Sequence, residues 1–145
     1  MSDVKRIVIR VDSSEQIGSG HLMRCLTLAE RLRKDGAEVH FISRDLVGSM
    51  HALVYDHDFR LHLLLRHEAN PALTGYAAWL TVPQTVDAEE TETILHQLRP
   101  VKRLVVDSYA LDAAWEQKMR PLVREIFVID DLANRQHDCD ILLDQ

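Results

Sequence analysis

Residues 10–21 constrain the fold of this chain more than any other segment. They follow an apolar run at residues 7–9, contain Gly18 and Gly20, and lead into an amphipathic stretch with His21 at its start. In an open α/β sheet such a loop lies at the carboxyl ends of the strands, where ligands bind. The helix dipole there favours a neutral imidazole, which can accept a proton from water or a hydroxyl. We therefore interpret residues 10–21 as a catalytic loop.

Short β-branched runs alternate with longer amphipathic runs along the chain. Leu22, Cys25 and Leu26 begin a helical i, i+3, i+4 pattern, and Gly36 follows its end. The expected strands are residues 7–11, 39–43, 60–65, 102–107, 125–130 and 140–143, and the expected helices are residues 21–34, 48–56, 87–98 and 112–122. Asp87 is expected to cap the third of these helices, and residues 67–86 to form an irregular connection. This alternation predicts an α/β fold with a doubly wound parallel sheet.

Composition limits the classes of partner. The 145 residues suit one domain, residues 1–145, and the net charge of −6 argues against a nucleic-acid or anionic membrane surface. Several basic residues in the first 35 positions still allow a small anionic ligand. No run has the roughly 18 apolar residues of a membrane helix. The two cysteines lack zinc spacing, which favours the reducing cytoplasm.

Polar residues occur at the ends of four of the predicted strands. They include Asp12 and Ser13, the segment 43–45, Asp107 with Tyr109, and Asp130. Asp and Ser also end strands and cap helices without any functional role. Because parallel strands end at one edge of the sheet, we nevertheless expect a polar binding site there. The candidate substrate-binding residues are Arg10, Asp12, Ser13, Gly18, Gly20, Asp107 and Asp130.

The two glycines fit only part of the dinucleotide-binding pattern G-x-G-x-x-G. Gly18 and Gly20 match its first two positions, but Met23 occupies the third, where a small residue is needed. We therefore expect no redox cofactor. The loop amides and the helix start could instead face an oxygen-rich or anionic ligand. We also expect no metal site, because His57, His62 and His67 lack ligand spacing.

Four blocks of sequence resemble a bacterial nucleotide-sugar hydrolase family of the pseudaminic-acid pathway, also known as spore-coat polysaccharide biosynthesis proteins. The blocks are R-V-D-S-S-E-Q-I-G-S-G-H-L-M-R-C-L-T-L-A, D-A-E-E-T, V-V-D-S-Y-A-L-D-A-A-W-E and I-D-D-L-A-N-R-Q-H-D-C-D-I-L-L-D-Q. The resemblance implies the N-terminal Rossmann-like domain of a GT-B enzyme, whose active site lies between two domains.

The resemblance also implies site residues and a reaction. His21 corresponds to the family's catalytic histidine and Tyr109 to an active-site tyrosine. Water would attack the anomeric carbon of a UDP-linked diacetamido-trideoxy-hexose and release UDP with inversion, without a metal or cofactor. Because UDP leaves readily, such an enzyme chiefly needs a general base and positioning.

The family continues beyond the final D-Q of this chain into a nucleotide-binding domain. We therefore expect the chain to be inactive alone and to self-associate through an uncovered apolar face. Two other functions remain open. The chain could be the acceptor domain of a GT-B glycosyltransferase, or a binding domain without catalytic activity.

Overall fold

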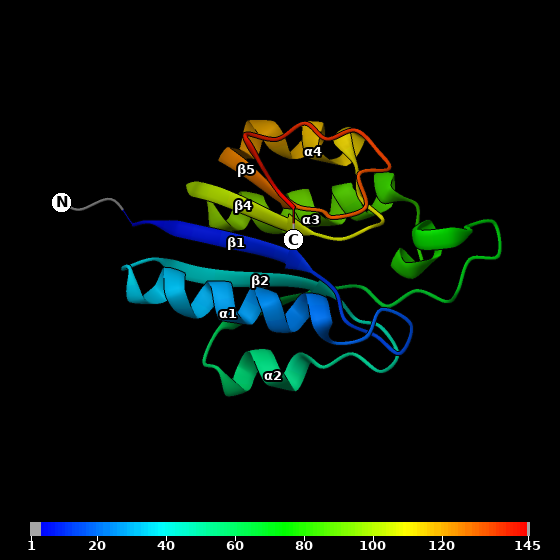
Figure 1. The fold of residues 1–145 in the computed structure, drawn as a ribbon, viewed down its shortest axis with the longest axis horizontal. Coiled ribbons are helices and arrows are strands. Elements are labelled where there is room, and N and C mark those ends of the chain that lie inside the picture. The colour runs from blue at the N-terminus through cyan, green and yellow to red at the C-terminus, as the bar shows by residue number, and fades with distance from the viewer. Residues whose placement is uncertain (1–3, 145) are drawn as a thin grey trace.

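The computed structural model describes residues 4–144 and places a parallel sheet between two layers of helices (Figure 1). The strands are β1 (Arg6–Val11), β2 (Glu38–Arg44), β3 (Arg60–Leu64), β4 (Val101–Asp107), β5 (Val123–Ile129) and β6 (Ile141–Leu143). The helices are α1 (Gly20–Lys34), α2 (His51–Asp56), α3 (Gln84–Leu98) and α4 (Ala113–Met119), with short 3₁₀ helices η1 (Gly75–Leu80) and η2 (Arg120–Leu122). The sheet order is β3-β2-β1-β4-β5-β6, and every pairing is parallel. The predicted α/β class with a Rossmann-like doubly wound sheet is confirmed.

Alternate residues of the central strands enter two separate cores. Ile7 and Ile9 of β1 pack against α1 and α2, whereas Val8 packs on the side of α3 and α4. Neighbouring Leu104 and Val105 of β4 divide in the same way. This two-residue period is that of a strand covered on both faces, which explains why these strands are almost continuously apolar. Figure 1 shows α1 and α2 on one side of the sheet and α3 and α4 on the other.

The chain reverses its direction of winding between β1 and β4. β1 pairs with β2 on one side and with β4 on the other, and Val11 lies opposite Asp107. The loops after these two strands therefore leave the sheet side by side, one toward each helical layer. Such a switch point is the usual ligand-binding position in open α/β sheets.

Several predicted element ends differ from the structure. The prediction that Asp87 caps a helix was wrong, because α3 begins at Gln84 after Pro83 and Asp87 lies buried in its first turn. A carboxylate in the first turn of a helix also interacts favourably with the positive end of the helix dipole. The helix predicted at residues 48–56 begins only at His51. Pro121 lies in the 3₁₀ turn η2, which follows the end of α4 at Met119.

No helix within residues 4–144 is both long enough and apolar enough to cross a membrane.

Candidate active site

A histidine, an aspartate and an arginine meet at the switch point. His21 lies in the first turn of α1, and Asp107 is the last residue of β4. The Nδ1 atom of His21 is 2.6 Å from Oδ1 of Asp107. Arg24 lies one helical turn after His21 and donates from Nε and Nη2 to both Asp107 oxygens, at 2.6 and 2.7 Å. The Asp107 carboxylate therefore holds the side chains of His21 and Arg24 in place.

The environment of Asp107 keeps its carboxylate charged. Burial alone would raise its pKa, but hydrogen bonds from Arg24 and His21 outweigh burial and hold the pKa below its usual value. A charged carboxylate only accepts hydrogen bonds, so the proton of the neutral imidazole is assigned to Nδ1. Nε2 of His21 is then the basic nitrogen, and within residues 4–144 it makes no hydrogen bond. The His21 side chain is only 13% exposed.

Tyr109 packs against this pair from the loop after β4. Its ring meets the His21 ring edge-on, with centroids 4.7 Å apart. Its hydroxyl donates a hydrogen bond to Oδ1 of Asp131 at 2.6 Å. That hydrogen bond, aided by burial, raises the pKa of Tyr109 to about 12. Tyr109 therefore stays neutral near pH 7 and offers the site an aromatic surface rather than a base.

A small niche lies at the His21 side chain. It is lined by Asp12, Ile17, His21, Trp79, Asp107, Ser108 and Tyr109. Its volume of about 10 Å³ is close to the minimum that accommodates one water molecule. The structure thus brings together His21, Tyr109, Asp12 and Asp107, four of the residues predicted from the sequence.

The loop between β1 and α1 is held by its own polar contacts. Ile17 donates its backbone N–H to the Ser14 hydroxyl, and Gly18 donates its own to the Ser14 carbonyl. Gly18 has a φ of 78°, a conformation that favours glycine. Gly20 has open space where a Cβ would lie. Ser13 is buried, and its hydroxyl accepts a hydrogen bond from the Met50 N–H, which ties this loop to the segment before α2.

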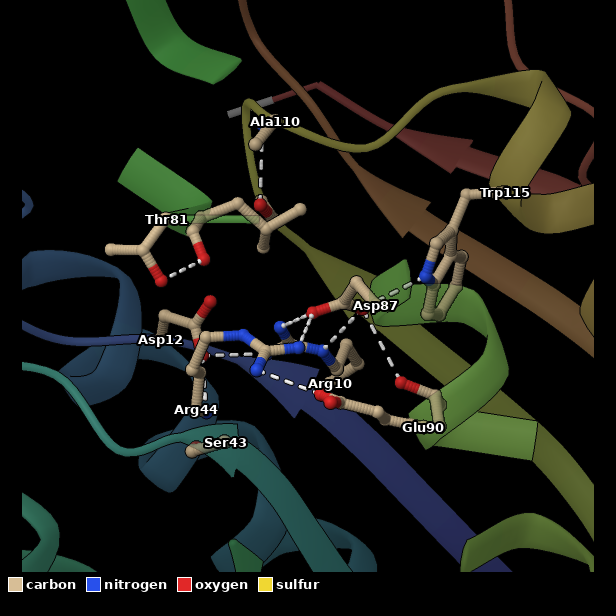
Figure 2. Close-up of polar contacts among 12 residues, drawn as sticks. Arg10, Asp12, Ser43, Arg44, Thr81, Asp87, Glu90, Ala110 and Trp115 are labelled. Carbon is tan, nitrogen blue, oxygen red and sulfur yellow. Dashed lines mark hydrogen bonds and ion pairs between the residues drawn. The ribbon is translucent and has the colours of Figure 1, made fainter. Parts of the chain in front are cut away.

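Figure 2 shows a second polar cluster, in which Arg10, Arg44 and Asp87 are fully buried. Arg10 donates to both Asp87 oxygens and, at 2.6 Å, to Asp12. Arg44 donates to Asp87 at 2.8 Å, and the Trp115 indole donates to it at 2.9 Å. The side chains of Arg10, Arg44 and Asp87 are all 0% exposed.

This cluster changes the role expected for Arg10. The Arg10 guanidinium is buried and donates its hydrogen bonds to Asp87 and Asp12. Arg10 is not among the residues that line the niche. Asp12 connects the two clusters, since it lines the niche while its Oδ1 accepts from Arg10 and from the Arg44 N–H. Arg10 therefore positions Asp12.

Asp130 lies in a third polar group, at the end of β5. Its carboxylate accepts hydrogen bonds from Arg135 and the Leu132 N–H, and its Oδ2 is 2.9 Å from Nε2 of His137. Arg135 also donates to the carbonyl of Ser108 at 2.7 Å. Asp130 is thus separate from the niche and supports the loop that carries Tyr109.

Sequence reasoning missed several residues around the niche. Arg24 could have been found, because its i, i+3 spacing from His21 places both on one helical face. Tyr76 and Trp79 lie in the segment predicted to be irregular, and their rings contact each other and Tyr109. Asp131, the partner of Tyr109, belongs with Asp130 to the polar residues expected at the end of the fifth predicted strand, but its contact with Tyr109 was not predicted. The described residues contain no group of three or more His, Cys, Asp or Glu side chains suited to a metal ion.

Comparison with solved structures shows a likeness in fold to a known protein. No family model matches the chain, and no curated protein sequence does. Among solved structures, the crystal structure of Acinetobacter baumannii MurG matches 89% of this chain with a TM-score of 0.63 and 15% identity. The chain spans 36% of the MurG chain. At this identity the likeness shows the fold alone, a Rossmann-like sheet that resembles the N-terminal domain of a GT-B protein.

Proposed function

We propose that this chain is the domain of a GT-B nucleotide-sugar enzyme that activates the attacking hydroxyl, with His21 as general base. One observation carries the proposal, the 2.6 Å contact between His21 Nδ1 and a buried aspartate at the switch point. It assigns the basic nitrogen to Nε2, on a side chain that lines the niche. A histidine oriented by a carboxylate is a common arrangement for removing a proton from a hydroxyl.

The reaction would proceed by attack of a hydroxyl oxygen on the anomeric carbon of the sugar. The bond from that carbon to the nucleotide phosphate breaks, and its electron pair leaves with the nucleoside diphosphate. His21 Nε2 takes the hydroxyl proton, and Asp107 stabilises the resulting imidazolium. Arg24 holds Asp107 in place through two hydrogen bonds. Because the diphosphate is a good leaving group, the base and its positioning supply much of what this step needs.

The nature of the attacking hydroxyl separates two candidate functions. The fold shared with MurG, a nucleotide-sugar glycosyltransferase, supports transfer to the hydroxyl of an acceptor. The four sequence blocks and a niche of about 10 Å³ support water, and hence hydrolysis of a UDP-sugar. We place transfer first, because the structural likeness to MurG covers 89% of this chain.

Replacement of His21 tests the proposed base. In the native protein that contains this sequence, His21→Asn should lower turnover of the nucleotide sugar by about 10²–10⁴-fold, with little change in binding. His57→Asn is a matched control, because His57 Nδ1 also faces a carboxylate, Glu30, at 3.2 Å on the surface. A His21→Asn variant within about threefold of the parent would contradict the proposal, since a lost general base costs far more.

The products distinguish the two candidates. Release of the nucleotide and free sugar without an acceptor would establish hydrolysis. Release that requires an added sugar or lipid-linked acceptor would establish transfer.

A further inference from the structure

We propose that the large cavity beside the niche is a carbohydrate subsite, in which Trp79 stacks on the apolar face of a neutral pyranose ring. The proposal rests on the proposed function, because it places a sugar next to His21. It assigns a ligand class to a region, residues 67–86, that the sequence did not explain.

Trp79 connects the cavity to the base. The cavity has a volume of about 680 Å³, within the range typical of small-molecule sites. It lies between the loop after β1, the segment after β2 and the segment after β3. Trp79 lines this cavity and also the niche at His21. A ring stacked on Trp79 in the cavity would therefore contact a residue that also lines the niche.

The indole is held in position by its neighbours. Leu80, the next residue, is 2% exposed and belongs to the core between the sheet and α3. Tyr76 meets the Trp79 ring edge-on at 4.7 Å, and Tyr109 lies 5.9 Å from it. Tyr76 itself is 39% exposed. A half-buried indole fixed in this way provides a rigid apolar surface with little entropy left to lose on binding.

The charges around the cavity favour a neutral, hydroxyl-rich ligand. Three carboxylates line it, from Glu15, Asp45 and Glu68. Arg66 also lines it, but its guanidinium is 2.9 Å from Asp45, and the two charges compensate each other. His67 also lines the cavity, and its Nε2 is 3.3 Å from a carboxylate oxygen of Glu90. The excess of carboxylates disfavours a phosphate. Carboxylates can accept hydrogen bonds from sugar hydroxyls, while Trp79 and Leu46 cover the C–H face.

The binding test follows the two indole N–H signals of this chain by NMR. The second tryptophan, Trp115, is 1% exposed and hydrogen-bonded to Asp87, so its signal is an internal reference. The ligands are the methyl glycosides of glucose, galactose, N-acetylglucosamine and N-acetylgalactosamine, then UDP-N-acetylglucosamine, UDP and glucosamine. We expect at least one of the methyl glycosides, or UDP-N-acetylglucosamine, to shift the Trp79 signal while the Trp115 signal stays unchanged.

The arms of this titration identify the source of the ring. A shift with the glycosides indicates an acceptor sugar, and a shift confined to UDP-N-acetylglucosamine indicates the sugar of the donor. No shift with any glycoside or with UDP-N-acetylglucosamine would overturn the subsite. So would an equal shift with UDP alone, or a shift with the cationic glucosamine only.

Variants test the role of the ring itself. Calorimetry with the best ligand should show that Trp79→Ala weakens binding about tenfold, because the apolar surface under the sugar ring is lost, and that Trp79→Tyr restores most of it. Tyr55→Ala is the control, because Tyr55 is an exposed aromatic residue on α2. Unchanged affinity in Trp79→Ala would overturn the proposal.

The two proposals can fail separately. His21→Asn should still show the sugar-induced shift of Trp79. Turnover that depends on His21 without any such shift would contradict the subsite alone. A shift of Trp79 with turnover that survives His21→Asn would contradict the proposed base alone.

Discussion

Two charged clusters lie on opposite sides of the end of β1, and they use their charges differently. Arg10, Arg44 and Asp87 are 0% exposed, and both arginines donate to Asp87 of α3. His21 and Arg24 come from α1 and remain partly exposed around Asp107. In the first cluster the charges serve packing. In the second, Nε2 of His21 makes no hydrogen bond within the described residues and the His21 side chain lines the niche, so we assign chemistry to that cluster and structure to the first.

The largest expected effect comes from breaking the buried cluster. Asp87→Ala would leave the guanidinium groups of Arg10 and Arg44 without their shared carboxylate inside the protein. We expect the free energy of unfolding to fall by about 3–5 kcal/mol, because removing one partner from a buried ion cluster is costly, even though Asp12 still pairs with Arg10 and Glu90 with Arg44. Urea unfolding followed by circular dichroism measures this loss. Asp45→Ala is the control, because its partner Arg66 is largely exposed and such pairs contribute little.

A loss in Asp87→Ala no larger than that in Asp45→Ala would contradict the division between the two clusters. It would mean that the buried charges are not held in the structure by Asp87.

A smaller effect is expected where the site reaches the surface. The hydrogen bond to Asp131 raises the pKa of Tyr109 to about 12, so Asp131→Asn should return that pKa toward the ordinary value of about 10. Because the pKa of Tyr109 is raised in the folded protein, the hydrogen bond stabilises the fold more at low pH than at high pH. The stability that this bond gives is complete below the unfolded-state pKa and is lost as the pH rises through the folded-state value. The pH titration of the Tyr109 ring carbons by NMR measures the shift, and an unchanged value in Asp131→Asn would contradict the assigned partner.

The sequence predicted the sheet better than the surroundings of the site. Strands and helices follow from local periodicity, which explains why β1, α1 and β4 lie close to their predicted bounds. His21 and Asp107 were predicted because a loop after a parallel strand must reach the binding edge of the sheet. Their pairing was not predicted, since it joins residues 86 positions apart.

Asp87 illustrates why the remainder could not be predicted. As a sequence pattern, an aspartate at the start of a helix indicates a cap. Its actual role depends on Arg10 of β1 and Arg44 of β2, which both donate hydrogen bonds to it. Trp79 and Tyr76 likewise lie in an aperiodic segment with a 3₁₀ turn, and only the fold brings them to Tyr109.

The most direct test of the central claim is the position of the proton on the neutral His21 ring. Long-range ¹H–¹⁵N NMR spectra of the labelled chain distinguish the two ring nitrogens, and the His21→Asn spectrum identifies the His21 signals. The structure predicts a proton on Nδ1, donated to Asp107, and an unprotonated Nε2 that can act as base. A neutral ring with its proton on Nε2 would contradict the account, because the nitrogen facing the niche could then not accept a proton.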